Sequence, residues 1–200
     1  MYSIQRHIEP VVKRRAENSK AIMLTGPRQV GKSTLFNHLF ADVNKVTFDD
    51  DVLLAQAATD ARLFMMNNPR PLMIDEVQKC PSIFNQVKII LDGTDERGNF
   101  FFTGSQKLQL MQGVSESLAG RVSVVELEGL SLREIHGVDF NSHFVPSEEY
   151  IVAREQHLKD YGENIWEIIH RGSCPELYAN PDREWADITG RTSTPLSSGT

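Results

Sequence analysis

The most informative run in this sequence is Gly26-Pro27-Arg28-Gln29-Val30-Gly31-Lys32-Ser33-Thr34. It matches the phosphate-loop pattern G-x-x-x-x-G-K-[ST] at every fixed position. The two glycines let the backbone turn so that its N–H groups face inward, where they attract phosphate oxygens. An apolar, strand-sized segment (residues 21–25) precedes the run, and a helical pattern follows it. The sequence therefore predicts a loop between a strand and a helix that binds the phosphates of a nucleotide.

The polar side chains of this run have separate predicted contacts. We expect Lys32 to reach the β- and γ-phosphates and the hydroxyl of Ser33 to bind Mg²⁺. We expect Thr34 to contact the α-phosphate side, and the helix that begins near Lys32 to add its N-terminal partial positive charge. The segment Asn44-Lys45-Val46-Thr47 lacks the Asp of the guanine-binding signature N-K-x-D. ATP is therefore the predicted ligand, rather than GTP.

An acidic pair, Asp75-Glu76, follows the apolar segment Leu72-Met73-Ile74. Ligands of open parallel sheets bind at the carboxyl ends of the strands, so this pair lies where a phosphate-bound metal ion needs carboxylates. Asp75 is predicted to hold Mg²⁺ through water. Glu76 is the predicted general base, which orients and activates a water for attack on the γ-phosphate. A solvated strand end is the alternative for such a pair alone, and the phosphate loop upstream favours the functional interpretation.

Three further side chains are candidates for contact with the γ-phosphate. Thr103 and Ser105 end a predicted strand that, in additional-strand phosphate-loop ATPases, lies between the phosphate-loop strand and the acidic strand. Either hydroxyl would then meet the γ-phosphate or the attacking water, and a plain turn is the alternative. Arg121 precedes the last predicted strand and is a candidate to stabilise transition-state charge on a neighbouring subunit's γ-phosphate. A surface arginine or a local ion pair is equally consistent with the sequence there.

Apolar strand-sized segments alternate with helical patterns along the chain. Beyond a lead-in helix before Asn18, the predicted strands cover about residues 21–25, 46–48, 72–74, 99–103 and 122–127. The predicted helices between and after them cover about residues 32–40, 52–67, 81–93, 107–118, 147–161 and 163–171, and Ser131 to Glu134 has capping-box spacing. This order predicts an α/β fold of the additional-strand phosphate-loop type, with a five-stranded parallel sheet sandwiched by helices and a short helical segment after it.

Composition narrows the class of protein. The 200 residues are 40% hydrophobic and 24% charged, which excludes a wholly disordered or collagen-like chain. No apolar run approaches the roughly 18–20 residues of a membrane span, and no secretory signal is visible, so we predict a cytoplasmic protein without a membrane partner. The net charge of −6 disfavours coating of nucleic acid by bulk electrostatics. The two cysteines are predicted to be reduced, and the six histidines form no close ligand pair for zinc.

Several short segments together resemble a known family. They are Leu24 to Thr34, Ile74-Asp75-Glu76-Val77-Gln78, Phe102-Thr103-Gly104-Ser105, Ser115 to Arg121, and Arg171-Gly172-Ser173-Cys174-Pro175-Glu176. In these the chain resembles the AAA-like ATPases of bacteria and archaea that carry a C-terminal domain of unknown function. The resemblance covers about Ile4 to Trp185. It implies an AAA+-like core, binding of Mg·ATP, hydrolysis by Glu76 and oligomeric use of Arg121.

The change of pattern after about Gly137 and the composition of the last residues predict a domain layout, and the resemblance implies the class of its core. We predict an AAA+-like core over residues 1–137, a helical extension over residues 138–186 and a disordered tail over residues 187–200, which is rich in Ser, Thr and Gly. Family members continue past the position of Trp185 into a region that is nuclease-like or contacts DNA, so the chain resembles a shortened member. DNA or a protein partner therefore remains open, as does a homo-oligomer.

Three functions compete at this point. The first is an ATP hydrolase of the AAA+ type, and the second is a nucleotide-gated switch that holds ATP with negligible turnover. The third, a kinase, is disfavoured because no arginine-rich lid is evident. Among the weaker features, Asp49-Asp50-Asp51 favours helix capping over contact with Mg²⁺ or ribose, and Lys13-Arg14-Arg15 favours a solvated helix face over contact with nucleic acid.

Overall fold

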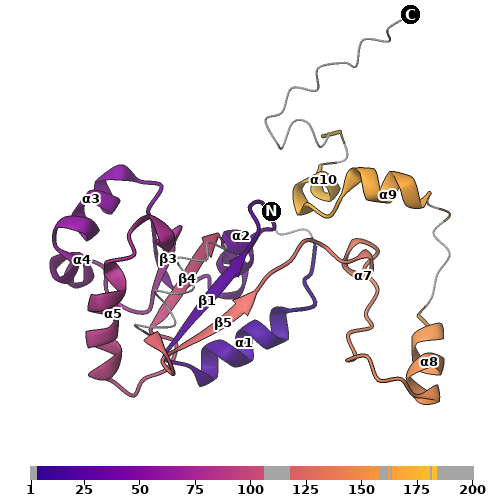
Figure 1. The fold of residues 1–200 in the computed structure, drawn as a ribbon, viewed down its shortest axis with the longest axis horizontal. Coiled ribbons are helices and arrows are strands. Elements are labelled where there is room, and N and C mark those ends of the chain that lie inside the picture. The colour runs from indigo at the N-terminus through magenta and orange to yellow at the C-terminus, as the bar shows by residue number, and fades with distance from the viewer. Residues whose placement is uncertain (1–3, 106–117, 158–161, 163, 181, 184–200) are drawn as a thin grey trace, which may run out of the picture. The chain divides into compact units, whose positions relative to one another are not determined.

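The structure of the chain is a computed structural model that describes residues 4–105, 118–157, 162, 164–180 and 182–183 (Figure 1). The described residues form two compact units. The first runs from His7 to Glu128, and the second combines residues 4–6 with the described residues from Gly129 onward. The domain boundary at residue 137 stays a prediction, and the predicted tail over residues 187–200 lies outside the described residues.

A five-stranded parallel sheet forms the centre of the first unit. Its strand order is β2-β3-β4-β1-β5. The strands are β1 (Ala21–Gly26), β2 (Asn44–Thr47), β3 (Leu72–Asp75), β4 (Phe100–Ser105) and β5 (Val122–Glu126). This order confirms the predicted fold class, because β4 lies between the strand before the phosphate loop and the strand that ends in Asp75. Both β1 and β4 are buried along their whole length, which explains their nearly continuous apolar sequences.

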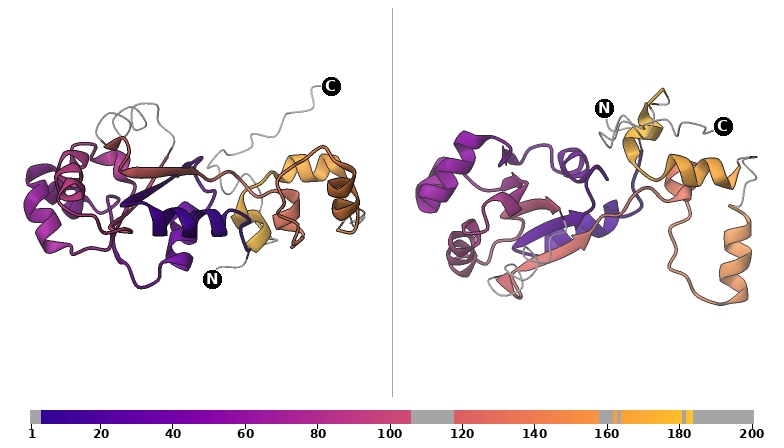
Figure 2. Two further views of the ribbon diagram at one scale, coloured as in Figure 1. Left: turned by 90° about the horizontal axis from the view of Figure 1, so that it is seen from below. Right: turned by 45° about the horizontal axis from the view of Figure 1, so that its top comes forward.

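Helices cover both faces of this sheet. Alternate residues of β1 enter two separate hydrophobic cores, Ile22 and Leu24 on one face and Ala21 and Met23 on the other. The first core is closed by α1 (Glu9–Asn18) and α2 (Lys32–Leu39), and the second by α3 (Asp51–Thr59), α4 (Ala61–Asn67) and α5 (Ile83–Asp92). The views of Figure 2 show α1 lying along β1 and β5. Loops at the carboxyl ends of the strands are thereby held on a rigid scaffold.

One predicted helix is divided into two at Asp60. The sequence predicts a single helix over residues 52–67, but the chain leaves helical geometry at Asp60 and begins again as α4. The Asp60 carboxylate accepts a hydrogen bond from the backbone N–H of Leu63 at 2.9 Å. An Asp side chain competes in this way for backbone donors, so it favours the start of a helix over its interior. Asp50 does the same at the start of α3, where it accepts from Val52 and Leu53, which confirms the predicted capping.

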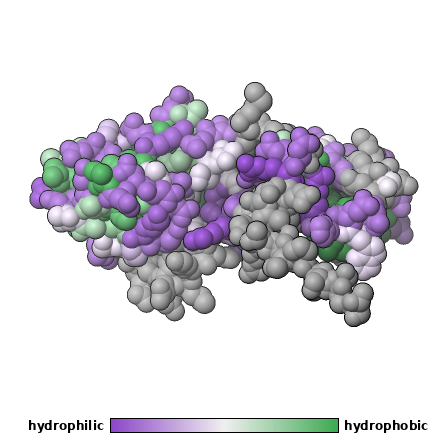
Figure 3. Space-filling view, turned by 90° about the horizontal axis from the view of Figure 1, so that it is seen from above, coloured by the Kyte–Doolittle hydropathy of each residue, from purple (hydrophilic) through white to green (hydrophobic). Residues whose placement is uncertain are grey.

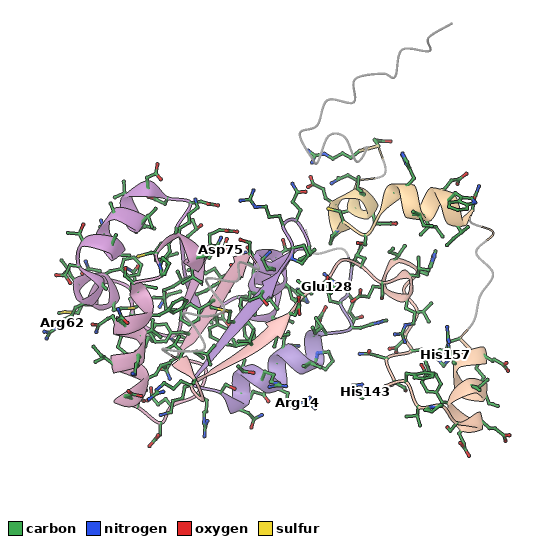
Figure 4. The ribbon with its side chains drawn as sticks, viewed as in Figure 1. Arg14, Arg62, Asp75, Glu128, His143 and His157 are labelled. Carbon is green, nitrogen blue, oxygen red and sulfur yellow. The ribbon has the colours of Figure 1, made fainter. Side chains whose placement is uncertain are left out.

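The remaining differences are smaller. The second strand begins at Asn44 and ends before Phe48, and the predicted helix over residues 107–118 lies almost entirely outside the described residues. On α1, Lys13 and Arg14 are exposed (Arg14 is labelled in Figure 4), while Arg15 donates to the Ser123 hydroxyl at 3.2 Å.

The second unit is built from short helices. They are α7 (Leu132–Ile135), α8 (Glu148–Glu155), α9 (Ile165–Arg171) and α10 (Pro175–Ala179), the last of which was not predicted. Ser131 and Glu134 form the predicted capping box at the start of α7. Within this unit Arg6 and Glu134 form a buried ion pair, with Nε and Oε1 3.1 Å apart. Arg6 also donates to the Gly129 carbonyl, so the N-terminal segment is tied to the beginning of the second unit.

The surface of the molecule is mostly hydrophilic in the view of Figure 3. Apolar side chains show at the end formed by α3 and α4, where Val52, Leu63 and Met66 are exposed. Across the described part of the chain, no helix combines the length and the apolar character needed to cross a membrane.

Candidate nucleotide-binding site

The loop between β1 and α2 takes a conformation that its glycines make possible. Gly26 has φ of +143° and Gly31 has φ of +89°, both in the region that favours glycine. A Cβ atom on Gly26 would lie 2.0 Å from the backbone oxygen of Leu127, so no larger residue fits there. Gln29 also has a positive φ, of 64°, which costs a non-glycine residue roughly 1 kcal/mol or more. The backbone therefore departs from regular structure in the run that the phosphate-loop pattern identified.

The side chains of the loop differ in burial: one is buried and three are exposed. Val30 is buried in the same core as α2 and holds the loop against the sheet. The loop residues Pro27, Arg28 and Gln29 are exposed, as is Thr34 in the first turn of α2. A ligand can therefore approach the loop from the solvent side, while Val30 keeps the loop fixed against the sheet.

Lys32 lies folded across this loop. Its Nζ donates to the backbone oxygens of Gly26, at 3.1 Å, and Pro27, at 2.6 Å. Burial lowers the pKa of the Lys32 ammonium below its ordinary value, and the nearby carboxylates of Glu76 and Asp75 act in the opposite direction. The loop thus holds a desolvated cation beside two carboxylates, and an anionic ligand would compensate for the water that the ammonium lacks.

Asp75 is the centre of a hydrogen-bonded group of predicted site residues. The Ser33 hydroxyl donates to its Oδ1 at 2.7 Å, and the Thr103 hydroxyl donates to the same oxygen. Thr103 in turn accepts from the backbone N–H of Glu76 at 3.3 Å. The parallel register that pairs Ile74 with Phe102 produces this arrangement, because the next residue on each strand is Asp75 or Thr103. Figure 4 labels Asp75 at the end of the sheet where α2 begins.

Glu76 turns the chain sharply out of β3. Its backbone is left-handed, with φ of 55° and ψ of 40°, and the short 3-10 helix η1 (Val77–Lys79) begins directly after it. This conformation is uncommon for a residue with a Cβ, and such strain gathers at functional sites. The Glu76 carboxylate accepts a hydrogen bond from the side-chain amide of Gln78. Sequence reasoning missed that contact, although Gln78 belongs to the short segment that carried the family resemblance.

The two candidate hydroxyls on β4 differ in their surroundings. Thr103 is fully engaged with Asp75 and Glu76. The Ser105 hydroxyl is buried and has no hydrogen-bond partner among the described residues. Ser105 is also the residue that pairs with Gly26 in the parallel register, so it borders the first residue of the loop. The structure therefore places Thr103 within the hydrogen-bonded group around Asp75, whereas the Ser105 hydroxyl takes no part in it.

Arg121 lies away from this group. It immediately precedes β5, whose first residue, Val122, pairs with Ala21 at the start of β1, whereas the loop follows the end of β1. The strands are parallel, so Arg121 lies at the amino ends of the strands, whereas the loop of its own chain lies at their carboxyl ends. Its guanidinium forms an ion pair with Asp92 and donates to the Ala119 carbonyl at 3.1 Å. The hydrogen bond that Arg121 Nε donates to the Asp92 carboxylate holds the pKa of Asp92 below its usual range.

The oxygen donors at this site suit Mg²⁺. Within the part of the chain that the structure describes, no group of three or more His, Cys, Asp and Glu residues is arranged to hold a metal ion. Mg²⁺ at phosphate sites commonly takes only one or two protein ligands and completes its shell with phosphate oxygens and water. A hydroxyl and a carboxylate in direct contact, Ser33 and Asp75, offer such a pair. Asp49, from the acidic run before α3, is instead paired with Lys79 at 2.6 Å.

Comparison with known proteins agrees with this geometry. Residues 18–136 match a family described as AAA domain. The uncharacterized proteins Mb2031c of Mycobacterium bovis and Rv2008c of Mycobacterium tuberculosis are each 34% identical over 125 residues, which is 62% of this chain and 28% of theirs. The chain thus spans little more than a quarter of these curated relatives.

Among solved structures, the Walker-type ATPase PABY2304 of Pyrococcus abyssi superposes with a TM-score of 0.50 at 11% identity. The match covers 85% of this chain and 63% of that one, and it shows a shared fold. The family match includes the phosphate loop, the acidic pair and all five strands, and it extends over more than half of the sequence. The chain therefore belongs to the AAA domain family of phosphate-loop ATPases.

Proposed function

We propose that this chain binds Mg·ATP and hydrolyses its β–γ phosphoanhydride bond. The observation that carries the proposal is the convergence of Ser33 and Thr103 on one oxygen of Asp75, with Glu76 as the next residue. This convergence at the carboxyl end of β3 supports a role for Ser33 and Asp75 in metal binding and for Glu76 as the base. Family membership supports nucleotide binding, and the arrangement of side chains supports the finer assignment.

Binding would use the loop and Lys32 together. Phosphate oxygens are stronger acceptors for an ammonium than backbone carbonyls are, so Lys32 would exchange Gly26 and Pro27 for the β- and γ-phosphates. Ser33 and Asp75 would hold Mg²⁺, Asp75 through water. The bound ion supplies positive charge that neutralises phosphate oxygens as negative charge shifts toward the leaving group.

Hydrolysis would use Glu76 as general base. Its carboxylate takes a proton from a water, the water oxygen forms a bond to the γ-phosphorus, and the bond to the β–γ bridging oxygen breaks. The bridging oxygen leaves with the electron pair as part of ADP, and inorganic phosphate is the second product. Thr103 fixes the backbone of Glu76, so the base starts from a defined position.

Calorimetric titration with Mg·ATP, followed by a phosphate-release assay on the same preparation, tests this function. Uptake of Mg·ATP in preference to Mg·GTP, with multiple turnovers of phosphate, would support it. Uptake without turnover would instead identify the chain as a nucleotide-gated switch. Absence of uptake by well-folded protein would exclude both functions.

Ser105 is proposed to donate its buried hydroxyl to the γ-phosphate. We expect Ser105→Ala to lower kcat for phosphate release by about tenfold to hundredfold, the range for one hydrogen bond to a charged group. The Kd for Mg·ATP should change less, because most phosphate contacts remain. Thr103→Val is the comparison: it removes the bonds to Asp75 and Glu76, so it should impair metal-dependent binding as well as turnover. Equal kcat for Ser105→Ala and the unmodified chain would remove Ser105 from the mechanism.

Arg121 is proposed to act on the γ-phosphate of a neighbouring copy, because it lies at the amino ends of the strands and its own phosphate loop lies at their carboxyl ends. The rate per chain should rise with protein concentration, and Arg121→Ala should abolish that rise. Asp92→Asn is a matched control, because it breaks the Arg121 ion pair and keeps the guanidinium.

Mixing Arg121→Ala chains with Glu76→Gln chains should restore activity, because the first chain supplies an intact Glu76 and the second an intact Arg121. A mixture as inactive as its components would contradict action in trans.

A further inference from the structure

Gln78 is held rigidly beside Glu76 by its neighbours in sequence. Val77 and Cys80 on either side are buried in the core, with exposed fractions of 0% and 3%. Backbone hydrogen bonds from Lys79 to Glu76, at 3.0 Å, and from Cys80 to Val77, at 3.1 Å, close the turn. The backbone that carries Gln78 therefore has little freedom, and its side chain returns over the turn to the Glu76 carboxylate.

The chemistry of this contact determines which way the amide faces. An ionised carboxylate only accepts hydrogen bonds, so the amide group that contacts it must be the nitrogen, and the donor is Nε2. The amide oxygen of Gln78 then points elsewhere. It is buried and has no hydrogen-bond partner among the described residues. A glutamine whose role is only structural is usually bonded through both halves of its amide, because an unpaired buried acceptor is costly.

The hydrogen bond from Gln78 uses one oxygen of the Glu76 carboxylate, Oε2, and leaves Oε1 to take a proton from water. We propose that Gln78 is a positioning residue for hydrolysis: its amide nitrogen holds the Glu76 carboxylate in the orientation from which it deprotonates the attacking water. This inference rests on the proposed ATPase function and adds a residue to the same site.

Replacement of the amide by a side chain of similar shape tests this role. Gln78→Met keeps the length of the side chain and removes the hydrogen bond to Glu76, so kcat should fall about tenfold to hundredfold while the Kd for Mg·ATP stays within about threefold. Gln78→Glu keeps the shape but sets a second carboxylate against Glu76, and it should lower kcat at least as much. Gln56→Met and Gln56→Glu, on the exposed side of α3, are the matched controls and should leave kcat unchanged.

A double-mutant cycle separates positioning from general damage. If Gln78 acts through Glu76, then Gln78→Met should have no further effect on kcat in a Glu76→Gln chain. Additive losses, a kcat unaffected by either Gln78 variant, or a parallel loss of Mg·ATP affinity and thermal stability in both would overturn the proposal.

A spectroscopic readout keeps this test independent of turnover. The side-chain amide of Gln78, identified in the nitrogen–proton correlation spectrum as the signal lost in Gln78→Met, should shift in the Glu76→Gln chain without any nucleotide present. An unmoved signal would contradict the contact with Glu76. If that signal shifts but the unmodified chain neither binds nor hydrolyses ATP, then the proposed function fails while the contact is shown to exist.

Discussion

The Glu76→Gln chain is expected to bind Mg·ATP with nearly unchanged affinity and to release phosphate about 10²- to 10⁴-fold more slowly, the usual contribution of a positioned general base. The amide has almost the size of the carboxylate but accepts no proton from water. The hydrogen bonds of Lys32 to the loop and of Ser33 to Asp75 do not involve the Glu76 carboxylate, so the groups proposed to bind phosphate and metal should stay in place.

Rapid-quench measurement of phosphate release, together with calorimetric Kd values, checks this expectation. Glu96→Gln is a suitable control, because Glu96 is an exposed carboxylate on the loop before β4, away from the carboxyl ends of the strands. A turnover rate for Glu76→Gln within about threefold of the unmodified chain would assign the base to another group. A loss of Mg·ATP binding as large as the loss of turnover would instead give Glu76 a role in binding.

Replacing Lys32 by Met should weaken Mg·ATP binding by about a hundredfold or more. The ammonium is the one side-chain cation buried against the loop in the described structure, and charge-assisted hydrogen bonds to phosphate are worth about 1.5–3 kcal/mol each. Methionine fills a similar volume without the charge. Because burial already lowers the pKa of Lys32, the nucleotide-free chain carries the cost of desolvating an ammonium, and removing it should not prevent folding.

Calorimetry again measures the effect, and circular dichroism establishes that the Lys32→Met chain is folded. Lys45→Met is the matched control, because Lys45 is exposed on β2 and should leave the Kd unchanged. A folded Lys32→Met chain that binds Mg·ATP as tightly as the unmodified chain would show that the phosphates lie elsewhere.

The two expected effects come from residues that short-range sequence patterns identified. Lys32 and the glycines form one contiguous run, in which the fixed spacing reflects the backbone turn that phosphate binding requires. Glu76 lies directly after an apolar segment, and a strand end of a parallel sheet is a known location for ligands. Both predictions depended on local sequence, and family membership and the strand order agree with the fold they imply.

The prediction of a single helix from local sequence was wrong at Asp60. Hydrophobic periodicity continues through residues 52–67, so the pattern predicts one helix, yet the Asp60 carboxylate begins a second helix by accepting from Leu63. The competition between a side chain and the backbone for one N–H group is settled by packing as well as by propensity. Ala57 before the break and Phe64 after it are both buried in the same core, and two short helices place them there.

The sequence by itself determined the phosphate loop, the acidic pair and the α/β class, because each depends on residues that are close in the chain. Tertiary structure alone decided that Thr103 bonds Asp75 while Ser105 borders Gly26, that Arg121 lies at the amino ends of the strands, and that Gln78 contacts Glu76. The first two follow from the order and register of strands separated by long stretches of sequence, and pairing between distant strands is set by the packing of the whole sheet. The third follows from a left-handed turn at Glu76, which burial of Val77 and Cys80 holds in place and which no local pattern of side chains predicts.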